Sequence, residues 1–272
     1  MEKEKQQLGN VVKNIREKQP IVFQITNAVT INDCANVTLA IGASPLMSYC
    51  EEELEDILGF ASALVINIGT MDRKMREMVV KAGQVANRFG KPVVLDPVGV
   101  GATKARKALV EELLANVQFA VIKGNMAEIK SIYGIENTAN RGVDSVEELE
   151  NGDEIAKALA KRYDTVIAVT GKQDIISDGH RVAKIDNGTA LLGKVTGTGC
   201  MTGALIGSAC GANRDYFMAA ATAVAMMGIA GEKAEEQLSA GDGNGTLRVK
   251  ILDSIYNMTD ERFMELEKIQ LS

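Results

Sequence analysis

Apolar residues between positions 20 and 170 fall into two alternating patterns. Short, almost continuously apolar runs predict buried strands over residues 21–26, 64–68, 92–96, 119–122 and 165–170. Between them, apolar residues at helical spacing predict helices over residues 30–41, 72–89, 103–115, 125–133 and 153–162. This alternation favours a parallel sheet with right-handed crossovers and helices on both faces.

The pattern changes after residue 170. Short runs at 174–177, 181–185 and 191–192 predict antiparallel strands, with turns at 178–179 and 187–188. Long apolar helices are expected over 201–211 and 216–237, then a flexible break at 241–245 and helices near 247–256 and 260–269. Because no repeat or interdomain linker interrupts the chain, we expect one domain over residues 1–272.

Composition and charge exclude several classes of protein. The 272 residues are 46% hydrophobic and 24% charged, which is ordinary for a globular chain. A net charge of −6 without any basic block argues against a nucleic-acid partner. The charged first residues do not resemble a signal peptide, and no apolar run reaches membrane-spanning length, so we expect a cytoplasmic protein without a membrane partner.

Cysteine and histidine usage narrows the chemistry. Four cysteines without Cys-x-x-Cys spacing are expected to be reduced thiols in a cytosolic chain. The single histidine, His180, follows the predicted turn at 178–179, where a surface position is expected. A histidine-rich zinc site or a Ser-His-Asp triad is therefore nearly excluded.

The most informative segment is residues 195–211. Gly197, Thr198 and Gly199 predict a flexible loop, and small residues at helical spacing follow. A glycine loop that leads into a helix directs free N–H groups and the helix dipole at an anion, commonly phosphate. Cys200, at the first turn, is placed to take a proton. The segment alone equally fits a tight loop before a closely packed helix, and it lacks the Gly-Lys-Ser/Thr of a Walker A loop.

Polar residues also follow each predicted parallel strand. They are Thr26, Asn27, Asn67, Gly69, Thr70, Asp96, Lys123, Asn125 and Thr170. Any one of them is explained by turn chemistry, but ligands bind beyond the carboxyl ends of parallel strands. Several such ends together favour one ligand cleft.

Asp96 and Glu128 are candidate ligands of Mg²⁺, which prefers a few carboxylates together with waters and phosphate oxygens. Glu128 lies three residues after Asn125, so the pair also fits a helix capping box. Both interpretations remain open at the level of the sequence.

Longer motifs carry a family resemblance. In chain order they are ITN (25–27), LAIGASPLM (39–47), NIGT (67–70), LDPVG (95–99), KGNMAEI (123–129), RGVD (141–144), VTG (169–171) and VTGTGC (195–200). From about residue 20 to the C-terminus, this series resembles the hydroxyethylthiazole kinases, which are thiamine-salvage members of the ribokinase-like superfamily. Related kinases share the glycine loop but usually carry aspartate at the position of Cys200.

The resemblance implies an α/β, ribokinase-like three-layer fold whose central, mostly parallel sheet is flanked by helices. It implies that ATP phosphorylates the hydroxyl of 4-methyl-5-(2-hydroxyethyl)thiazole in thiamine biosynthesis or salvage. It further implies a homotrimer with active sites at subunit interfaces.

The resemblance also assigns roles to residues of this chain. Met47 and Gly197 would contact the thiazole, with Asn27 nearby; Lys123 and Thr170 would contact ATP; Asp96 and Glu128 would serve Mg²⁺. Cys200 takes the place of the catalytic base, and the N–H groups of Gly197, Thr198 and Gly199 would stabilise the transferring phosphoryl group. Lys123 departs from the family pattern, in which arginine is common, and so lacks a bidentate fork for ATP.

Three alternatives remain beside this interpretation. One is a pyrimidine or pyridoxal kinase, which aspartate at position 200 would have favoured. Another is a lyase of the NAD(P)H-hydrate dehydratase kind. The third is a non-catalytic sensor of thiamine precursors, which would not need Asp96, Glu128 and the glycine loop together.

Overall fold

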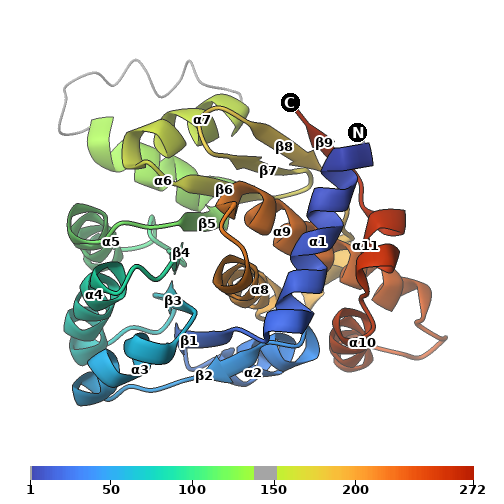
Figure 1. Ribbon diagram of the computed structural model, residues 1–272, viewed down its shortest axis with the longest axis horizontal. Coiled ribbons are helices and arrows are strands. Elements are labelled where there is room, and N and C mark those ends of the chain that lie inside the picture. The colour runs from blue at the N-terminus through green and yellow to red at the C-terminus, as the bar shows by residue number, and fades with distance from the viewer. Residues whose placement is uncertain (1, 138–151) are drawn as a thin grey trace.

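The apolar runs form the strands of one sheet in the computed structural model, which describes residues 2–137 and 152–272 (Figure 1). The strands are β1 (Ile21–Ile25), β2 (Ser44–Leu46), β3 (Ala63–Asn67), β4 (Val93–Asp96), β5 (Val121–Asn125), β6 (Val166–Thr170), β7 (Asp174–Ser177), β8 (Val182–Ile185) and β9 (Ile269–Leu271). Their order is β2-β1-β3-β4-β5-β6-β7-β8-β9. The pairs from β2 to β6 are parallel, and those from β6 to β9 are antiparallel.

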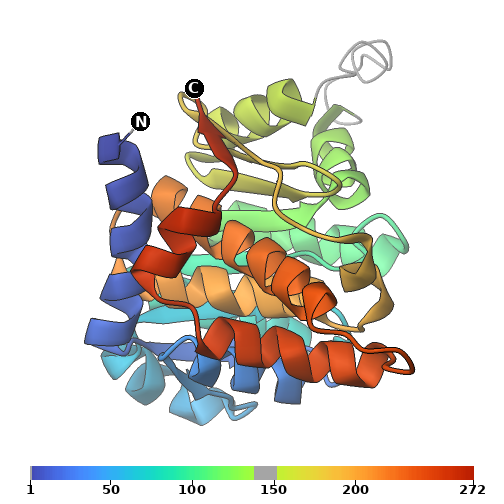
Figure 2. The same cartoon turned by 90° about the vertical axis from the view of Figure 1, so that its right-hand side faces the viewer.

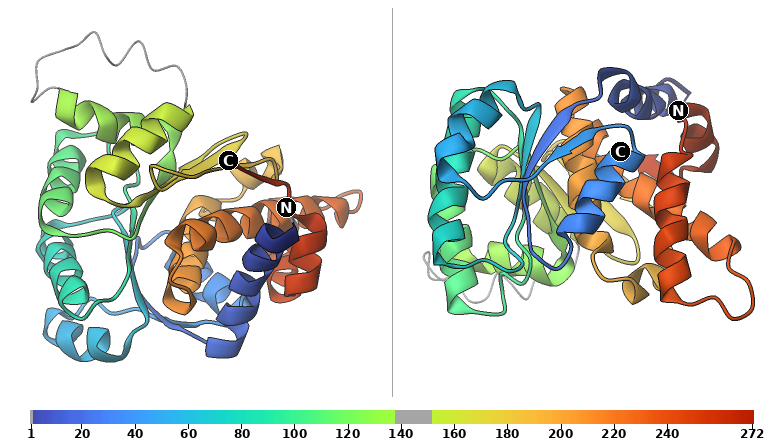
Figure 3. Two further views of the ribbon diagram at one scale, coloured as in Figure 1. Left: turned by 45° about the horizontal axis from the view of Figure 1, so that its top comes forward. Right: turned by 90° about the horizontal axis from the view of Figure 1, so that it is seen from below.

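Helices cover both faces of this sheet, as Figure 3 shows. One layer holds α3 (Leu54–Phe60), α4 (Arg73–Arg88), α5 (Lys104–Asn116), α6 (Met126–Asn137) and α7 (Gly152–Tyr163). The other holds α1 (Glu2–Lys18), α2 (Ile31–Ala40), α8 (Thr198–Ala212), α9 (Tyr216–Glu236), α10 (Asn244–Tyr256) and α11 (Asp260–Leu266), of which α9 to α11 face the viewer in Figure 2. A separate apolar core fills each interface. The predicted three-layer α/β fold is confirmed.

Several elements were not predicted from the sequence, among them α1, β2 and α3. Helix α1 buries Leu8, Val11, Val12 and Ile15, a regular helical stripe that the sequence does contain. Strand β2 is three residues long and contains Pro45, which an edge strand tolerates. Helix α3 is a short segment, and its seven residues give too few turns for a clear period.

Several predicted boundaries were wrong. Residues 191–192 are not a strand but belong to the 3-10 helix η3 (Ala190–Lys194), because the side chain of Thr189 caps a tight turn there. The last predicted helix ends at Leu266, and the chain then joins the sheet as β9. His180 is exposed in its turn, as predicted. The motif at residues 141–144 lies outside the described residues.

Helix α8 begins earlier than predicted, and this changes the description of the glycine loop. Thr198 and Gly199 belong to its first turn, and Gly197 is its N-cap with φ +93°, a conformation that glycine adopts without strain. Further along, a Cβ at Gly207 would overlap with Val65 Cγ2 of β3. The small residues therefore let the helix lie close against the sheet. The close-packing interpretation of this segment is confirmed, and it brings the helix start to the carboxyl edge of the strands.

Among the described residues, no helix is long and apolar enough to cross a membrane. All four cysteines lie in the described part of the chain and are free thiols there.

Candidate active site

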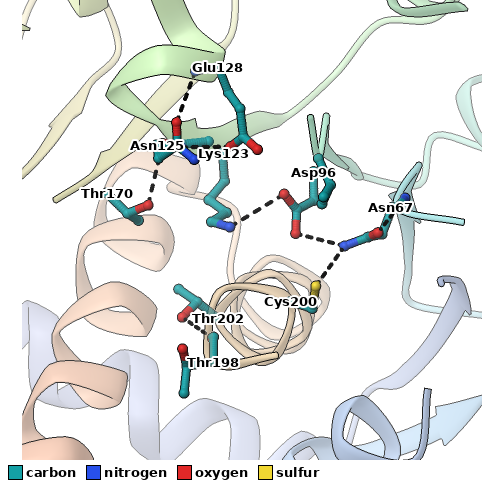
Figure 4. A network of polar contacts seen from close by, with 12 residues as sticks. Asn67, Asp96, Lys123, Asn125, Glu128, Thr170, Thr198, Cys200 and Thr202 are labelled. Atoms are coloured by element: carbon teal, nitrogen blue, oxygen red, sulfur yellow. Dashed lines mark hydrogen bonds and ion pairs between the residues drawn. The ribbon is translucent and has the colours of Figure 1, made fainter. Parts of the chain in front are cut away.

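The carboxyl ends of the parallel strands meet opposite the first turn of α8 (Figure 4). β3 and β4 end in register, with Asn67 beside Asp96, and β5 and β6 end with Asn125 beside Thr170. Because parallel neighbours end at the same edge, their last side chains converge. The polar residues that end these strands therefore lie at one edge of the sheet, where the sequence predicts a ligand cleft.

A buried ion pair lies at the centre of this edge. Lys123 Nζ is 3.3 Å from Asp96 Oδ1, and the two side chains are 5% and 1% exposed. Burial raises the pKa of the Asp96 carboxyl to about 6, because desolvation outweighs the attraction of Lys123, and Glu128 adds to the rise. Burial alone would lower the pKa of the Lys123 ammonium, but the charges of Asp96 and Glu128 hold it above its ordinary value. The ammonium of Lys123 is thus the main influence that favours the charged form of Asp96.

Glu128 has structural partners of its own at the start of α6. Its Oε2 accepts from the backbone N of Asn125 at 2.8 Å, and Asn125 Oδ1 accepts from the backbone N of Glu128 at 2.9 Å. This is the capping box that the sequence allowed. Its second oxygen, Oε1, accepts from the backbone N of Gly99 at 2.9 Å and so holds the loop after β4. Capping does not exclude a metal role, because each carboxylate oxygen retains a further lone pair.

The Cys200 sulfur lies on the side of α8 that faces β1 and β3. Asn27 Nδ2 approaches Cys200 Sγ at 3.3 Å, and Asn67 Nδ2 approaches it at 3.2 Å. Asn67 also donates to Asp96 Oδ2 at 2.8 Å. The proposed proton acceptor and the buried acid are therefore connected through one side chain.

The first turn of α8 lies against the ion pair. A Cβ on Gly199 would lie 3.2 Å from Lys123 Nζ, so the ammonium lies directly at this turn. A Cβ on Gly197 would lie 2.6 Å from Thr30 Cγ2, which places the N-cap against the turn that carries Asn27. The helix dipole and Lys123 together make this point favourable for an anion.

A cavity of about 770 Å³ extends from the same turn of α8 toward β6 and α9. Its lining includes Thr170, Gly171, Thr198, Gly199, Thr202 and Met227. Thr170 Oγ1 lies 3.4 Å from the carbonyl oxygen of Gly124, at the carboxyl end of β5. The cavity is large enough for a nucleotide-sized ligand. A second hollow, of about 660 Å³, lies at the opposite edge of the strands, around Pro92 and Thr165, away from these groups.

Met47 and Asn27 lie on the other side of α8, at the ends of β2 and β1. Met47 directly follows β2 and packs against the core that includes α2. Asn27 is buried, while Val29 beside it is 65% exposed. Met47 and Asn27 thus follow the carboxyl ends of two adjacent parallel strands, whereas the third predicted thiazole contact, Gly197, is the N-cap of α8.

Two residues that shape this edge were not assigned a role from the sequence. Asn67 was noted only as a polar strand end. Arg106, from α5, had no signal at all, yet its guanidinium donates to the carbonyl oxygens of Ile68, Gly69 and Val98. It joins the loops after β3 and β4, because one planar fork reaches several carbonyls at once. Only the fold brings α5 to these loops.

The class of protein follows from fold and site together. A ribokinase-like superfamily protein from Enterococcus faecalis V583 superposes with a TM-score of 0.61 at 11% identity, over 92% of this chain and 89% of that one. At such low identity the likeness shows the fold alone. The architecture is therefore ribokinase-like, and the start of α8 and a nucleotide-sized cavity lie together at the carboxyl edge of its sheet.

Closer relatives specify the family. The model of the hydroxyethylthiazole kinase family matches residues 12–261. A hydroxyethylthiazole kinase from Thermoanaerobacter pseudethanolicus (strain ATCC 33223 / 39E) is 47% identical over 260 residues, 96% of this chain and 98% of its own length. The structure of a hydroxyethylthiazole kinase protein from Pyrococcus horikoshii OT3 is 39% identical, with a TM-score of 0.88 over 97% of this chain and 98% of that one. The chain belongs to the hydroxyethylthiazole kinase family.

Proposed function

We propose that this protein transfers the γ-phosphoryl group of ATP to the hydroxyl of 4-methyl-5-(2-hydroxyethyl)thiazole, in thiamine biosynthesis or salvage. The observation that carries the proposal is the placement of Cys200 on the first turn of α8, between a nucleotide-sized cavity and the edge that holds Asn27 and Met47. Family membership supports the same substrate. We also propose that residues 1–272 form one kinase domain, because the strands of a single sheet and the helices packed on it carry every part of the site.

The mechanism follows from charge and position. Phosphoryl transfer needs alignment and charge neutralisation more than covalent chemistry. The N–H groups of Gly197, Thr198 and Gly199 bind the oxygens of the transferring group, and Lys123 adds a positive charge beside them. Thr170 contributes a hydroxyl to the nucleotide side. Cys200 orients the acceptor hydroxyl and takes its proton, which leaves late in a loose transition state, so a modest base suffices.

The residues fit a magnesium ion that arrives with the nucleotide. Among the described residues, no three His, Cys, Asp or Glu side chains gather closely enough to form a metal cage. Mg²⁺ does not need such a cage, since it keeps several waters and binds through one or two carboxylates and phosphate oxygens. Asp96 and Glu128, whose charges interact across the site, would hold it there. When bound, the ion supplies positive charge that neutralises the phosphates.

Lys123 brings a single positive charge to the nucleotide side of the site. Its ammonium is anchored to Asp96 and reaches the first turn of α8 as a point charge. A point charge attracts phosphate without imposing the bidentate geometry of arginine. We therefore propose that Lys123 serves the phosphates of ATP.

Because ATP is the proposed donor, we also propose a cytoplasmic location.

The capping box allows the charge of Glu128 to be tested separately from its structural role. We expect Glu128→Ala to lower kcat about 10- to 100-fold, through the loss of metal positioning. Glu128→Gln retains a carbonyl oxygen for the capping box but loses the charge, and should be almost as impaired. The measurement is steady-state kcat with a magnesium titration, at equal thermal stability. A Glu128→Gln enzyme with unchanged kcat and magnesium dependence would show that Glu128 is only a helix cap.

The assembly is proposed to be a homotrimer with its active sites between subunits. Large, exposed apolar side chains between residues 29 and 49 support this: Val29 is 65% exposed, Leu39 57% and Tyr49 49%. We expect light scattering to give about three times the 29.1 kDa chain mass. Leu39→Lys should shift the distribution to smaller, less active species, whereas Phe89→Lys, at the end of α4, should not. A fully active monomer at assay concentration contradicts the proposal.

The substrate assignment is tested with a panel of alcohols in a coupled ADP-release assay. An apolar pocket with few placed polar groups suits a small, neutral heteroaromatic alcohol. We expect the highest kcat/KM for hydroxyethylthiazole, with pyridoxal, hydroxymethylpyrimidine and sugars well below it. A sugar or a phosphorylated pyrimidine with a higher kcat/KM would overturn the assignment. NADH formation from hydrated NADH, assayed in parallel, tests the lyase alternative.

A further inference from the structure

The orientation of the Asn67 side-chain amide is fixed by its neighbours. Asn67 ends β3 and is 1% exposed. Its Oδ1 accepts from the backbone N of Gly69 at 2.9 Å and from Asn27 Nδ2 at 3.0 Å. Two N–H donors on one side identify the oxygen end of the amide, so Nδ2 faces the opposite way.

The amide nitrogen of Asn67 has two hydrogens, and each has a different acceptor. One is directed to Asp96 Oδ2 at 2.8 Å, and the other to Cys200 Sγ at 3.2 Å, as the dashed lines in Figure 4 show. Asp96 is the register neighbour of Asn67 on β4, which fixes their separation through the backbone. One rigid amide therefore sets the distance between the buried carboxylate and the thiol.

Asn27 completes the surroundings of the sulfur. Its Oδ1 accepts from the backbone N of Val29 and of Thr30, both at 3.1 Å, so its Nδ2 must face the site. That nitrogen donates to Asn67 Oδ1 and approaches Cys200 Sγ at 3.3 Å. The sulfur thus meets N–H donors from two fixed amides and is a hydrogen-bond acceptor toward both.

We propose that Asn67 is a positioning residue for phosphoryl transfer, which holds the Cys200 sulfur as a hydrogen-bond acceptor at a fixed distance from Asp96. The inference rests on the proposed function. Asn67 acts through Cys200 and Asp96, and not by contact with the phosphoryl group or the acceptor hydroxyl. Its oxygen end is occupied by Gly69 and Asn27, so the amide cannot turn without breaking both contacts.

The kinetic test uses Asn67→Ala and Asn67→Asp. The aspartate variant preserves the side-chain volume and the oxygen that accepts from Gly69 and Asn27. In place of the amide nitrogen, however, it presents a second oxygen to Asp96 and Cys200, which are both acceptors. Loss of one fixed hydrogen-bond partner should lower kcat about 10-fold, with KM for both substrates within about threefold. In a Cys200→Ala background the same change should cost much less, because its effect passes partly through the sulfur. An unchanged kcat, or an equal loss in both backgrounds, overturns the proposal.

A matched control separates positioning from general disturbance of the sheet. Gln24, on the adjacent strand β1, is another fully buried amide, and its Nε2 donates to Thr38 Oγ1 at 2.8 Å. Gln24→Met removes a buried amide of similar size without touching Cys200 or Asp96. We expect it to change thermal stability but to leave kcat within about twofold of wild type.

The rate of Cys200 alkylation by iodoacetamide gives a readout that needs no substrate. It is measured by intact-mass spectrometry at fixed pH in a Cys50→Ser background, because Cys50 is exposed. Removal of an N–H donor withdraws stabilisation from negative charge on the sulfur, so Asn67→Ala should alkylate several-fold more slowly. A merely loosened site would expose the thiol and speed alkylation. An equal or faster rate therefore overturns the proposal, whereas failure of the thiazole assay alone would overturn only the substrate assignment.

Discussion

Replacement of Asp96 by alanine is expected to lower kcat by about 10²- to 10³-fold, because several kcal/mol of charge stabilisation in the transition state is lost with the metal and the ion pair. Asp96 is fully buried at the end of β4, and Lys123, Asn67 and the first turn of α8 all converge on it. Its removal leaves the Lys123 ammonium buried without its partner, which also costs stability. Activity is measured as steady-state kcat and kcat/KM for both substrates.

Asp96→Asn separates loss of charge from loss of contact. The amide retains an oxygen for Asn67 and nearly the same volume, so folding should be less disturbed than in the alanine variant, while kcat stays low. Asp33 provides a control: its buried carboxylate pairs with Arg248 on α10, outside the site. Asp33→Asn should lower the melting temperature without a large change in kcat. An Asp96→Asn enzyme with near wild-type kcat would contradict the assigned role.

Cys200→Ala is expected to lower kcat about 10- to 100-fold without abolishing it, because a positioned proton acceptor contributes to the rate but alignment by the helix start remains. Cys200→Asp should retain or raise kcat. The position is in the first turn of α8, where the dipole and free N–H groups stabilise a negative side chain. The amides of Asn27 and Asn67 already point at this site as donors, which suits a carboxylate equally well.

A covalent mechanism predicts the opposite result. If the Cys200 sulfur attacked the γ-phosphorus, aspartate would not simply take over its role, and a phosphothiol enzyme would accumulate. Direct in-line transfer needs no enzyme nucleophile. The decisive measurement is kcat of both variants, combined with intact-mass spectrometry after a single turnover. The exposed Cys50, changed to serine, should leave both readouts unaltered. An inactive aspartate variant together with a phosphorylated cysteine would overturn the mechanism.

The local pattern of apolar residues predicted strands and helices well where an element was long enough to show a clear run or period. The buried parallel strands read as continuous apolar runs because helices cover both faces, and their positions agree with β1 and β3 to β6 within a few residues. Short or edge elements such as β2 and α3 carry too few residues for a period. Strand β9 was missed because its partner, β8, lies more than eighty residues away in the chain, so that no local pattern marks the pairing.

In the candidate site, too, the sequence marked some residues and gave no sign of others. Motifs and strand-end position singled out Asp96, Lys123, Glu128 and Cys200, and these residues converge on one edge of the sheet. Their individual roles remain proposals. Arg106 could not be found from the sequence, because its three carbonyl partners are set by the approach of α5 to two loops.

By itself, the sequence determined the alternation of strands and helices, the glycine-rich helix start and the set of polar residues at strand ends. These features are local, since each depends on residues only a few positions apart. The tertiary structure alone decided that Lys123 pairs with Asp96, that Glu128 both caps α6 and holds Gly99, and that Asn67 lies between Asp96 and Cys200. Such contacts join residues that are distant in the chain, and they exist only because the parallel strands end together beneath one helix.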